Sequence, residues 1–229
     1  IERCVNDLEL KLLCLPTHYI NKDGHWHSIA EEEVNPIFEL ANKYGLALQI
    51  HPYDGEKMIA LKNQYWRFHL VWMMAQCADT LHLFTLRDLP NKYPNLRTSF
   101  AHGGMLGIAS YGRRIQGFDG RPDIFKELED PRKTLGHKNL YFDSLVHDSH
   151  TLDLLIKRVG VSQIIMGLDD PFPLGEIEIE SFLDSEIFSV QIINPTANSP
   201  SVPTARTTEK SLSPSKKIIV LVSPNSCII

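Results

Sequence analysis

The chain has 229 residues, of which 43% are hydrophobic, and its formal net charge at neutral pH is −5. This length allows one sizeable domain or two small ones. The weak negative charge argues against nucleic acid or an anionic membrane as a partner, and no apolar run approaches the roughly 18 residues that a membrane span needs. The four cysteines are far apart and form no CxxC pair, so we expect free thiols and a cytoplasmic location.

The chain begins at Ile1 rather than at a methionine, so we expect a processed or cut piece. Its first residues lack the charged and apolar regions of a signal peptide. Further along, apolar runs typical of strands alternate with helical patterns. Strands are expected at residues 11–15, 46–50, 96–101, 139–142 and 162–166. Helices are expected to end near residue 8, to lie at 29–41, 55–88 and 151–159, and to run through 113 and 114; residues 21–27 are expected to form a polar loop.

Two residues predict where the helix at 29–41 begins and ends. Pro36 suits the first turn of a regular helix, because its missing N–H is not needed there. Gly45 suits the position just after the last turn, where the backbone turns left-handed.

A polar residue follows each predicted strand at the point where it ends: Thr17, His51, His102, Asp143 and Asp169. Repeated strand–helix units form parallel sheets. Polar side chains at successive strand ends favour a (β/α) barrel over an open sheet, because a barrel brings them to one site. A complete barrel has eight strands in about 250 residues. Residues 1–187 are therefore predicted to be an α/β domain, a partial TIM (β/α)8 barrel with about five strands.

The composition changes in the last part of the chain. Residues 188–229 are rich in serine, threonine and proline and show no helical period, which predicts a disordered tail. Within this tail, residues 218–222 are a lone β-prone run.

Three of the strand ends carry side chains that suit a metal. His51 and His102 supply imidazole nitrogens and Asp169 supplies a carboxylate, which fits Zn²⁺ or another divalent ion with an open position for water. A single histidine at a strand end is more commonly a structural hydrogen-bonding group. The spacing alone leaves both interpretations open.

Four segments together resemble the amidohydrolase superfamily. They are His51-Pro52-Tyr53-Asp54, Ala101-His102-Gly103-Gly104, residues 141–148 (Tyr-Phe-Asp-Ser-Leu-Val-His-Asp) and residues 169–176 (Asp-Asp-Pro-Phe-Pro-Leu-Gly-Glu). The Pro-Phe-Pro-Leu-Gly-Glu run and Tyr65-Trp66 are similar to the branch that decarboxylates aminocarboxymuconate semialdehyde, in tryptophan breakdown by the kynurenine route. The resemblance covers about residues 1–187 and implies a metal-dependent carboxy-lyase acting on a small carboxylate.

The resemblance also implies roles for particular residues. Zn²⁺ would be held by a His-x-His pair on the first barrel strand together with His51 and Asp169, and Asp169 would also count among the catalytic groups. His102 would be the general acid and base. Arg113 would bind a substrate carboxylate in the neighbouring subunit of a homodimer, and Trp66 would belong to a lid over the substrate.

The chain departs from the family pattern at several points. The first-strand His-x-His pair is absent, and His25-Trp26-His27 has its letters but follows a strand in a polar loop. Leu168, Asp170 and Met105 stand where the family has a small hydroxyl residue, an aromatic residue and a glycine. With two of four expected ligands, this chain alone is expected to bind Zn²⁺ weakly and to be inactive.

Two alternatives remain beside the decarboxylase. The first is a hydrolase of the same superfamily, in which Asp169 acts as a base toward water. The second is a non-catalytic, truncated barrel, whose open strand edges would favour association or aggregation.

Overall fold

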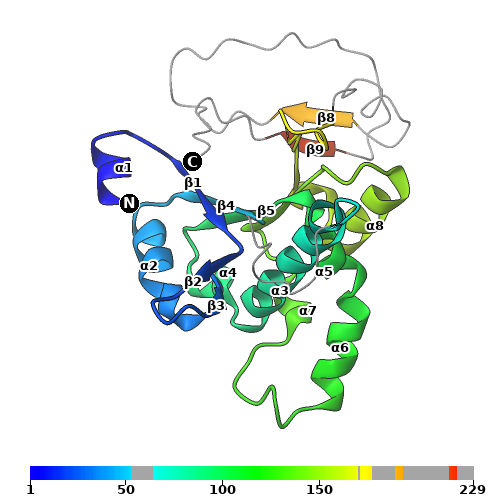
Figure 1. The fold of residues 1–229 in the computed structure, drawn as a ribbon, viewed down its shortest axis with the longest axis horizontal. Helices are drawn as coiled ribbons and strands as arrows, with labels where there is room; N and C mark the ends of the chain where they lie inside the picture. The colour runs from blue at the N-terminus through cyan, green and yellow to red at the C-terminus, as the bar shows by residue number, and fades with distance from the viewer. Residues whose placement is uncertain (53–63, 170, 177–188, 193–216, 221–229) are drawn as a thin grey trace.

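The computed structural model describes residues 1–52, 64–169, 171–176, 189–192 and 217–220. Its centre is a five-stranded parallel sheet with the order β1-β4-β5-β6-β7, so its strands pair in the order in which they occur in the chain. Figure 1 labels β1, β4 and β5 of this sheet. The strands are β1 (Leu12–Pro16), β4 (Ala47–His51), β5 (Arg97–Phe100), β6 (Leu140–Asp143) and β7 (Ile164–Ile165). All five predicted strands are therefore confirmed, in the sequential order of a (β/α) barrel.

Helices connect the strands of this sheet. They are α1 (Glu2–Asn6), η1 (Glu32–Val34), α2 (Asn35–Lys43), the π-helix η3 (Phe68–Trp72), α3 (Met73–Leu86), α4 (Leu89–Lys92), η4 (His102–Gly104), α5 (Met105–Ala109), α6 (Tyr111–Gly120), α7 (Pro131–Thr134), α8 (Ser149–Val159) and η5 (Val161–Gln163). As predicted, Pro36 lies in the first turn of α2, and Gly45, with a φ of 62°, follows its last turn.

An aromatic core joins the helices to the sheet. Phe38 of α2 meets Phe84 of α3 edge-on, with ring centroids 6.1 Å apart. Phe84 in turn meets Phe100 of β5, which stacks on Phe142 of β6 at 6.1 Å. Phe100 and Phe142 are paired in register, and all four side chains are fully buried. This packing fixes neighbouring strands relative to one another and so fixes where their ends lie.

The opposite face of the sheet is polar. Side chains alternate along a strand, so Gln49, Ser99 and Tyr141 point away from the aromatic core. These three residues are in register across β4, β5 and β6. The Ser99 hydroxyl donates to the Gln49 Oε1 atom over 2.9 Å. This face corresponds to the interior of a barrel.

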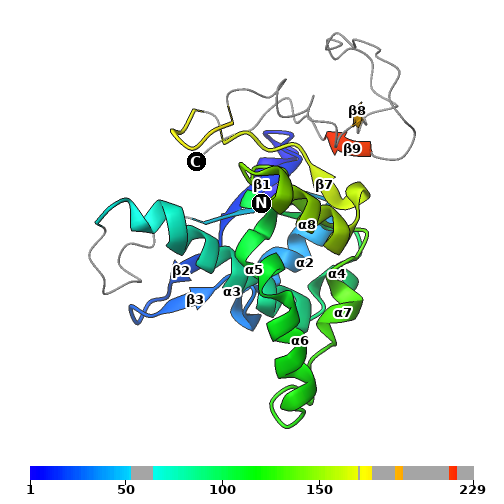
Figure 2. The same cartoon turned by 90° about the vertical axis from the view of Figure 1, so that its right-hand side faces the viewer.

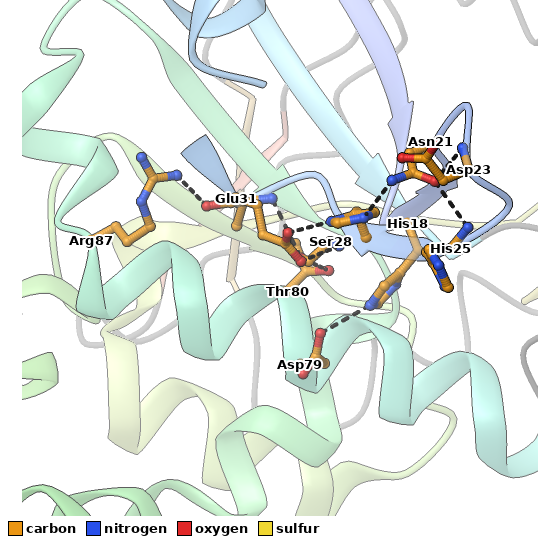
Figure 3. A network of polar contacts seen from close by, with 11 residues as sticks. His18, Asn21, Asp23, His25, Ser28, Glu31, Asp79, Thr80 and Arg87 are labelled. Carbon is orange, nitrogen blue, oxygen red and sulfur yellow. Dashed lines mark hydrogen bonds and ion pairs between the residues drawn. The ribbon is translucent and has the colours of Figure 1, made fainter. Parts of the chain in front are cut away.

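The loop predicted at residues 21–27 is wrong in part, because the chain folds back there as an antiparallel hairpin of β2 (His18–Ile20) and β3 (Trp26–Ser28). Figure 3 shows the polar contacts that hold it. His18 Nε2 lies 2.9 Å from the Asp79 carboxylate of α3, and the Ser28 hydroxyl donates to Thr80 of α3. Contacts with a distant helix thus stabilise strands that are too short to be recognised locally.

The last strand of the sheet is shorter than predicted. Residues 162 and 163 were predicted as strand but belong to η5, and the Gln163 side-chain amide donates to the main-chain carbonyls of His137 and Leu140 at 3.2 and 3.1 Å. These bonds tie the chain to the start of β6 and leave only Ile164 and Ile165 paired with it.

The predicted disordered tail contains two described segments, and both are strands. β8 (Ser189–Ile192) and β9 (Lys217–Val220) pair in parallel. β9 contains the first residues of the β-prone run at 218–222, which therefore pairs with another part of the tail. The rest of residues 188–229 lies outside the described residues.

Other expectations concern the chain as a whole. Cys4, Cys14 and Cys77 are free thiols as expected, and Cys227 lies outside the described residues. Within the described ranges, no helix is both long and apolar enough to cross a membrane.

Candidate metal centre

Three strand ends bring His51, His102 and Asp169 together. His51 is the last residue of β4, His102 begins η4 directly after β5, and Asp169 follows β7. One potential ligand atom from each lies within 4.8 Å of those of the other two, and this is the only such cluster of three or more among the described residues. His51 Nε2 is 3.7 Å from Asp169 Oδ1, and the two imidazole centroids are 5.0 Å apart.

The ring of His51 is oriented by its own backbone neighbour. Its Nδ1 atom lies 2.6 Å from the Pro52 carbonyl oxygen, to which it can only donate. This bond fixes a proton on Nδ1, so in the neutral form of the ring the lone pair is on Nε2, the atom that faces Asp169. Metal-binding histidines commonly have this arrangement, with one ring nitrogen donating and the other free for the ion.

His102 is buried, with 8% of its surface exposed, and its Nε2 atom has no hydrogen-bond partner. Burial lowers its pKa to about 4, and the nearby His51 and His147 act in the same direction while Asp169 opposes them. The ring is therefore neutral at pH 7. A buried, neutral and unpartnered imidazole nitrogen is available either to a metal ion or to a proton in transfer.

Asp169 is held on a tight turn. Its main-chain carbonyl accepts from the Phe172 N–H at 2.9 Å, and the Glu176 N–H donates to the Leu168 carbonyl at 2.8 Å. The turn includes Pro171 and Pro173. Asp169 has a φ of 52°, which lies in the left-handed region. Asp170 lies outside the described residues.

A further carboxylate, Asp143, lies buried beside this cluster at the end of β6. Burial raises its pKa to about 6, while N–H groups of Gly103, His102 and Leu145 pull in the opposite direction. The sequence placed Asp143 at a strand end but gave it no role. The signals available were its strand-end position and its place in the segment 141–148 that resembles the family.

The three clustered side chains fit a divalent metal ion. Two neutral imidazoles and one carboxylate are the donor types that Zn²⁺ and similar ions take, and catalytic sites commonly use three protein ligands with a position left for water. The bond from His51 to Pro52 orients one imidazole, and the Nε2 atom of His102 has no hydrogen-bond partner, so both rings could ligate such an ion. His102 thus belongs geometrically with the two predicted ligands.

The structure does not bring Arg113 or Trp66 into this cluster. Arg113 is exposed on α6, which extends away from the sheet in two views (Figure 1, Figure 2). Trp66 is 40% exposed and packs on His69, with ring centroids 5.2 Å apart. Among the described residues, no hydrogen bond, ion pair or ring contact joins either side chain to His51, His102 or Asp169.

The His25-Trp26-His27 triplet is also separate from the cluster. His27 donates or accepts at both ring nitrogens, lying 2.6 Å from Glu31 and 3.0 Å from Asn21. The bond to Glu31 raises the pKa of His27. Through these bonds His27 stabilises the hairpin.

Comparison with known proteins places these observations in a family. Residues 1–200 match the family model described as amidohydrolase. A curated relative from Dictyostelium discoideum, named 2-amino-3-carboxymuconate-6-semialdehyde decarboxylase, is 32% identical over 81% of this chain and 50% of its own length. One of the same name from Caenorhabditis elegans is 35% identical over 61% of this chain and 35% of its own length. The chain thus spans at most about half the length of these relatives.

Solved structures share the fold at lower identity. The 5-carboxyvanillate decarboxylase of Sphingomonas paucimobilis matches with a TM-score of 0.61 and 21% identity, over 74% of this chain and 51% of that one. The enzyme of the same name from Novosphingobium aromaticivorans, solved with manganese and 4-hydroxy-3-methoxy-5-nitrobenzoic acid, matches with a TM-score of 0.63 and 16% identity, over 76% and 50%. The partial TIM-barrel fold is thereby confirmed. With its strand-end histidines and aspartate on this fold, the chain belongs to the amidohydrolase family.

Proposed function

We propose that the chain is part of a metal-dependent decarboxylase, a carboxy-lyase that releases CO₂ from a small carboxylate substrate. The observation that carries this proposal is the convergence of His51, His102 and Asp169 at the carboxyl ends of parallel strands. The decarboxylase names of the curated relatives support the reaction type.

The substrate we propose is 2-amino-3-carboxymuconate 6-semialdehyde, in tryptophan breakdown by the kynurenine route. Its support is the name that both curated relatives carry. The Pro-Phe-Pro-Leu-Gly-Glu run of residues 171–176 supports the same branch.

In this proposal, His51 and Asp169 hold the divalent ion, which we take to be Zn²⁺. His102 is either a third ligand or the group that carries a proton. When bound, the ion supplies Lewis-acid polarisation of an oxygen in the substrate or in water.

His102 suits proton transfer because Nε2 is neutral and unpartnered at pH 7. This atom can accept a proton from water and pass it to the carbon that bears the leaving carboxylate. The bond to the carboxylate then breaks, CO₂ departs and a C–H bond takes its place. General acid–base catalysis of this kind contributes about 10²- to 10⁴-fold in rate.

Arg113 and Trp66 act in this proposal from outside the cluster. A guanidinium pairs with a carboxylate in two parallel hydrogen bonds, so Arg113 would bind the substrate across the interface of a homodimer. Its exposed position on α6, without an ion pair among the described residues, leaves it available to a neighbouring subunit. Trp66 would cover the substrate. A cytoplasmic location stays a prediction, supported by three free cysteines.

The test measures CO₂ release from the semialdehyde by the protein that carries this chain. His102→Asn should lower kcat by about 10²- to 10⁴-fold, since asparagine tolerates the left-handed backbone. Arg113→Ala should chiefly raise KM, and the unaltered protein should elute as a dimer. Hydrolysis of a lactone or amide without CO₂ release would instead indicate the hydrolase alternative. If the protein turns over neither kind of substrate, the proposal that it is an enzyme is wrong.

A further inference from the structure

Strand β6 lies between β5, which is followed by His102, and β7, which is followed by Asp169. Phe142 of β6 pairs with Phe100 of β5, and Asp143 pairs with Ile165 of β7. The end of β6 is therefore flanked by the His102 turn on one side and the Asp169 turn on the other. Asp143 and Ser144 occupy that end, and both are 5% exposed.

Asp143 bonds to the turn that carries His102. Its Oδ1 atom accepts from the Gly103 N–H at 2.8 Å and from the Leu145 N–H at 3.2 Å. His102, Gly103 and Gly104 have φ values of 53°, 60° and 55°, so three consecutive residues adopt the left-handed conformation. For a non-glycine residue this conformation costs about 1–2 kcal/mol. The hydrogen bond from Gly103 offsets part of that cost and fixes the direction in which His102 leaves the strand.

Ser144 and Asp143 also hold the segment that leads to Asp169. The Ser144 hydroxyl accepts from the Gly167 N–H at 3.3 Å. A Cβ atom on Gly167 would lie only 2.6 Å from Asp143 Cβ, so the backbone at Gly167 packs directly on Asp143. Asp143 therefore contacts both turns, and Ser144 adds a second contact to the segment that leads to Asp169.

Burying the Asp143 carboxylate at this position costs free energy. Burial of an ionised group without partners is strongly unfavourable, and main-chain N–H groups compensate only in part. A small apolar residue would fill the same space without that cost. The polar pair at the end of β6 therefore serves the placement of the two turns more than the stability of the sheet.

We propose that Asp143 and Ser144 are positioning residues of the metal centre, which hold the His102 and Asp169 turns at the spacing that a divalent ion requires. This inference rests on the proposed metal site. Neither side chain needs to touch the ion or the substrate. Substitution of residues that support metal ligands from behind commonly weakens metal binding by about 10- to 100-fold.

The test titrates the full chain with Co²⁺ and follows the visible absorption of the bound ion. Asp143→Ala and Ser144→Ala should each weaken Co²⁺ binding by about 10- to 100-fold and change the absorption bands. Asp143→Asn keeps an oxygen that can accept from Gly103 and should restore most of the affinity. Leu140→Val is the matched control, because Leu140 is equally buried at the opposite end of β6. It should lower the melting temperature and leave Co²⁺ affinity unchanged.

The outcomes separate this inference from the proposed function. Unchanged Co²⁺ affinity and spectrum in both alanine variants would overturn the positioning role and leave the metal site standing. If Leu140→Val weakens Co²⁺ binding as much as the alanine variants do, the weakening is an effect of lower stability, and the positioning role is overturned as well. If the unaltered chain binds no Co²⁺, the metal site itself is wrong and the inference falls with it. Should Asp143→Ala fail to fold, Ser144→Ala carries the test, since it removes only the bond to Gly167.

Discussion

The backbone at His102 and at Asp169 is left-handed, with φ values of 53° and 52°. Single non-glycine residues in this region are uncommon, and they cluster where a side chain must leave a strand in a particular direction. Both residues follow strands at the same edge of the sheet. Hydrogen bonds stabilise each turn. The turn of His102 bonds to Asp143, and the turn of Asp169 is held by main-chain bonds within residues 168–176.

The first prediction concerns acid stability of the metal-free chain. The pKa of His102 is about 4 in the folded chain against an ordinary value of 6.5. Between these values the unfolded chain binds a proton there and the folded chain does not, so stability falls as pH falls from about 6.5 to about 4. At about 1.4 kcal/mol per pKa unit, the loss is up to about 3 kcal/mol.

Asp143 acts in the opposite sense, because burial raises its pKa to about 6 and stability from this group falls as pH rises through the same window. Only a comparison isolates His102. Urea unfolding at pH 7 and pH 5 should show a smaller loss on acidification in His102→Asn than in the unaltered chain. An identical loss in both, or a His102 ring that titrates near pH 6.5 by NMR, would contradict the neutral buried ring.

At the scale of elements, close packing of α3 against α5 sets the position of η4, which carries His102. Gly107 of α5 faces α3, and a Cβ atom there would lie 2.9 Å from Leu81 Cδ2 and 3.3 Å from the Ala78 Cα atom. The Arg114 guanidinium also donates to the Gly107 carbonyl at 2.9 Å. The two helices can approach this closely only because residue 107 has no side chain.

We predict that Gly107→Ala lowers the free energy of unfolding by about 1–3 kcal/mol, since the added methyl group forces α5 away from α3. Gly112→Ala is the matched control. Gly112 is also helical, and a Cβ atom there meets nothing within 4 Å. Because alanine favours helix over glycine by about 1 kcal/mol, the control should be unchanged or slightly more stable. Chemical denaturation of both variants is the measurement, and equal effects would rule out the tight contact.

The elements differ in how far the sequence could predict them. The runs that became β4 and β5 are short and bounded by glycine, proline or histidine, and apolar residues alternate with polar ones along them, so the local pattern was sufficient. The hairpin of β2 and β3 was missed because its strands have three residues each and depend on contacts with Asp79 and Thr80, far along the chain. The late start of the last strand, at Ile164, goes with the bonds of Gln163 to the segment before β6 and to Leu140, which no local pattern reveals.

At the scale of the whole molecule, five parallel strands place three ligand-type side chains at one edge, although the chain spans at most about half the length of its curated relatives. Strand-end positions and the family resemblance predicted His51, His102 and Asp169 from the sequence. The sequence predicted that these three side chains meet at one site, but it could not predict that His102 and Asp169 enter it from left-handed turns. The support from Asp143 was likewise invisible, because it depends on the order of the strands.

The most direct measurement is a Zn²⁺ titration of the metal-stripped full chain, with His51→Ala, Asp169→Ala and His25→Ala measured beside it. We predict one Zn²⁺ site per chain, weak enough to be emptied by dialysis against a chelator. It should be lost in His51→Ala and Asp169→Ala and unchanged in His25→Ala, because His25 lies exposed in the hairpin. Zn²⁺ binding that survives both of the first two substitutions, or that depends on His25, would contradict a metal centre at these strand ends.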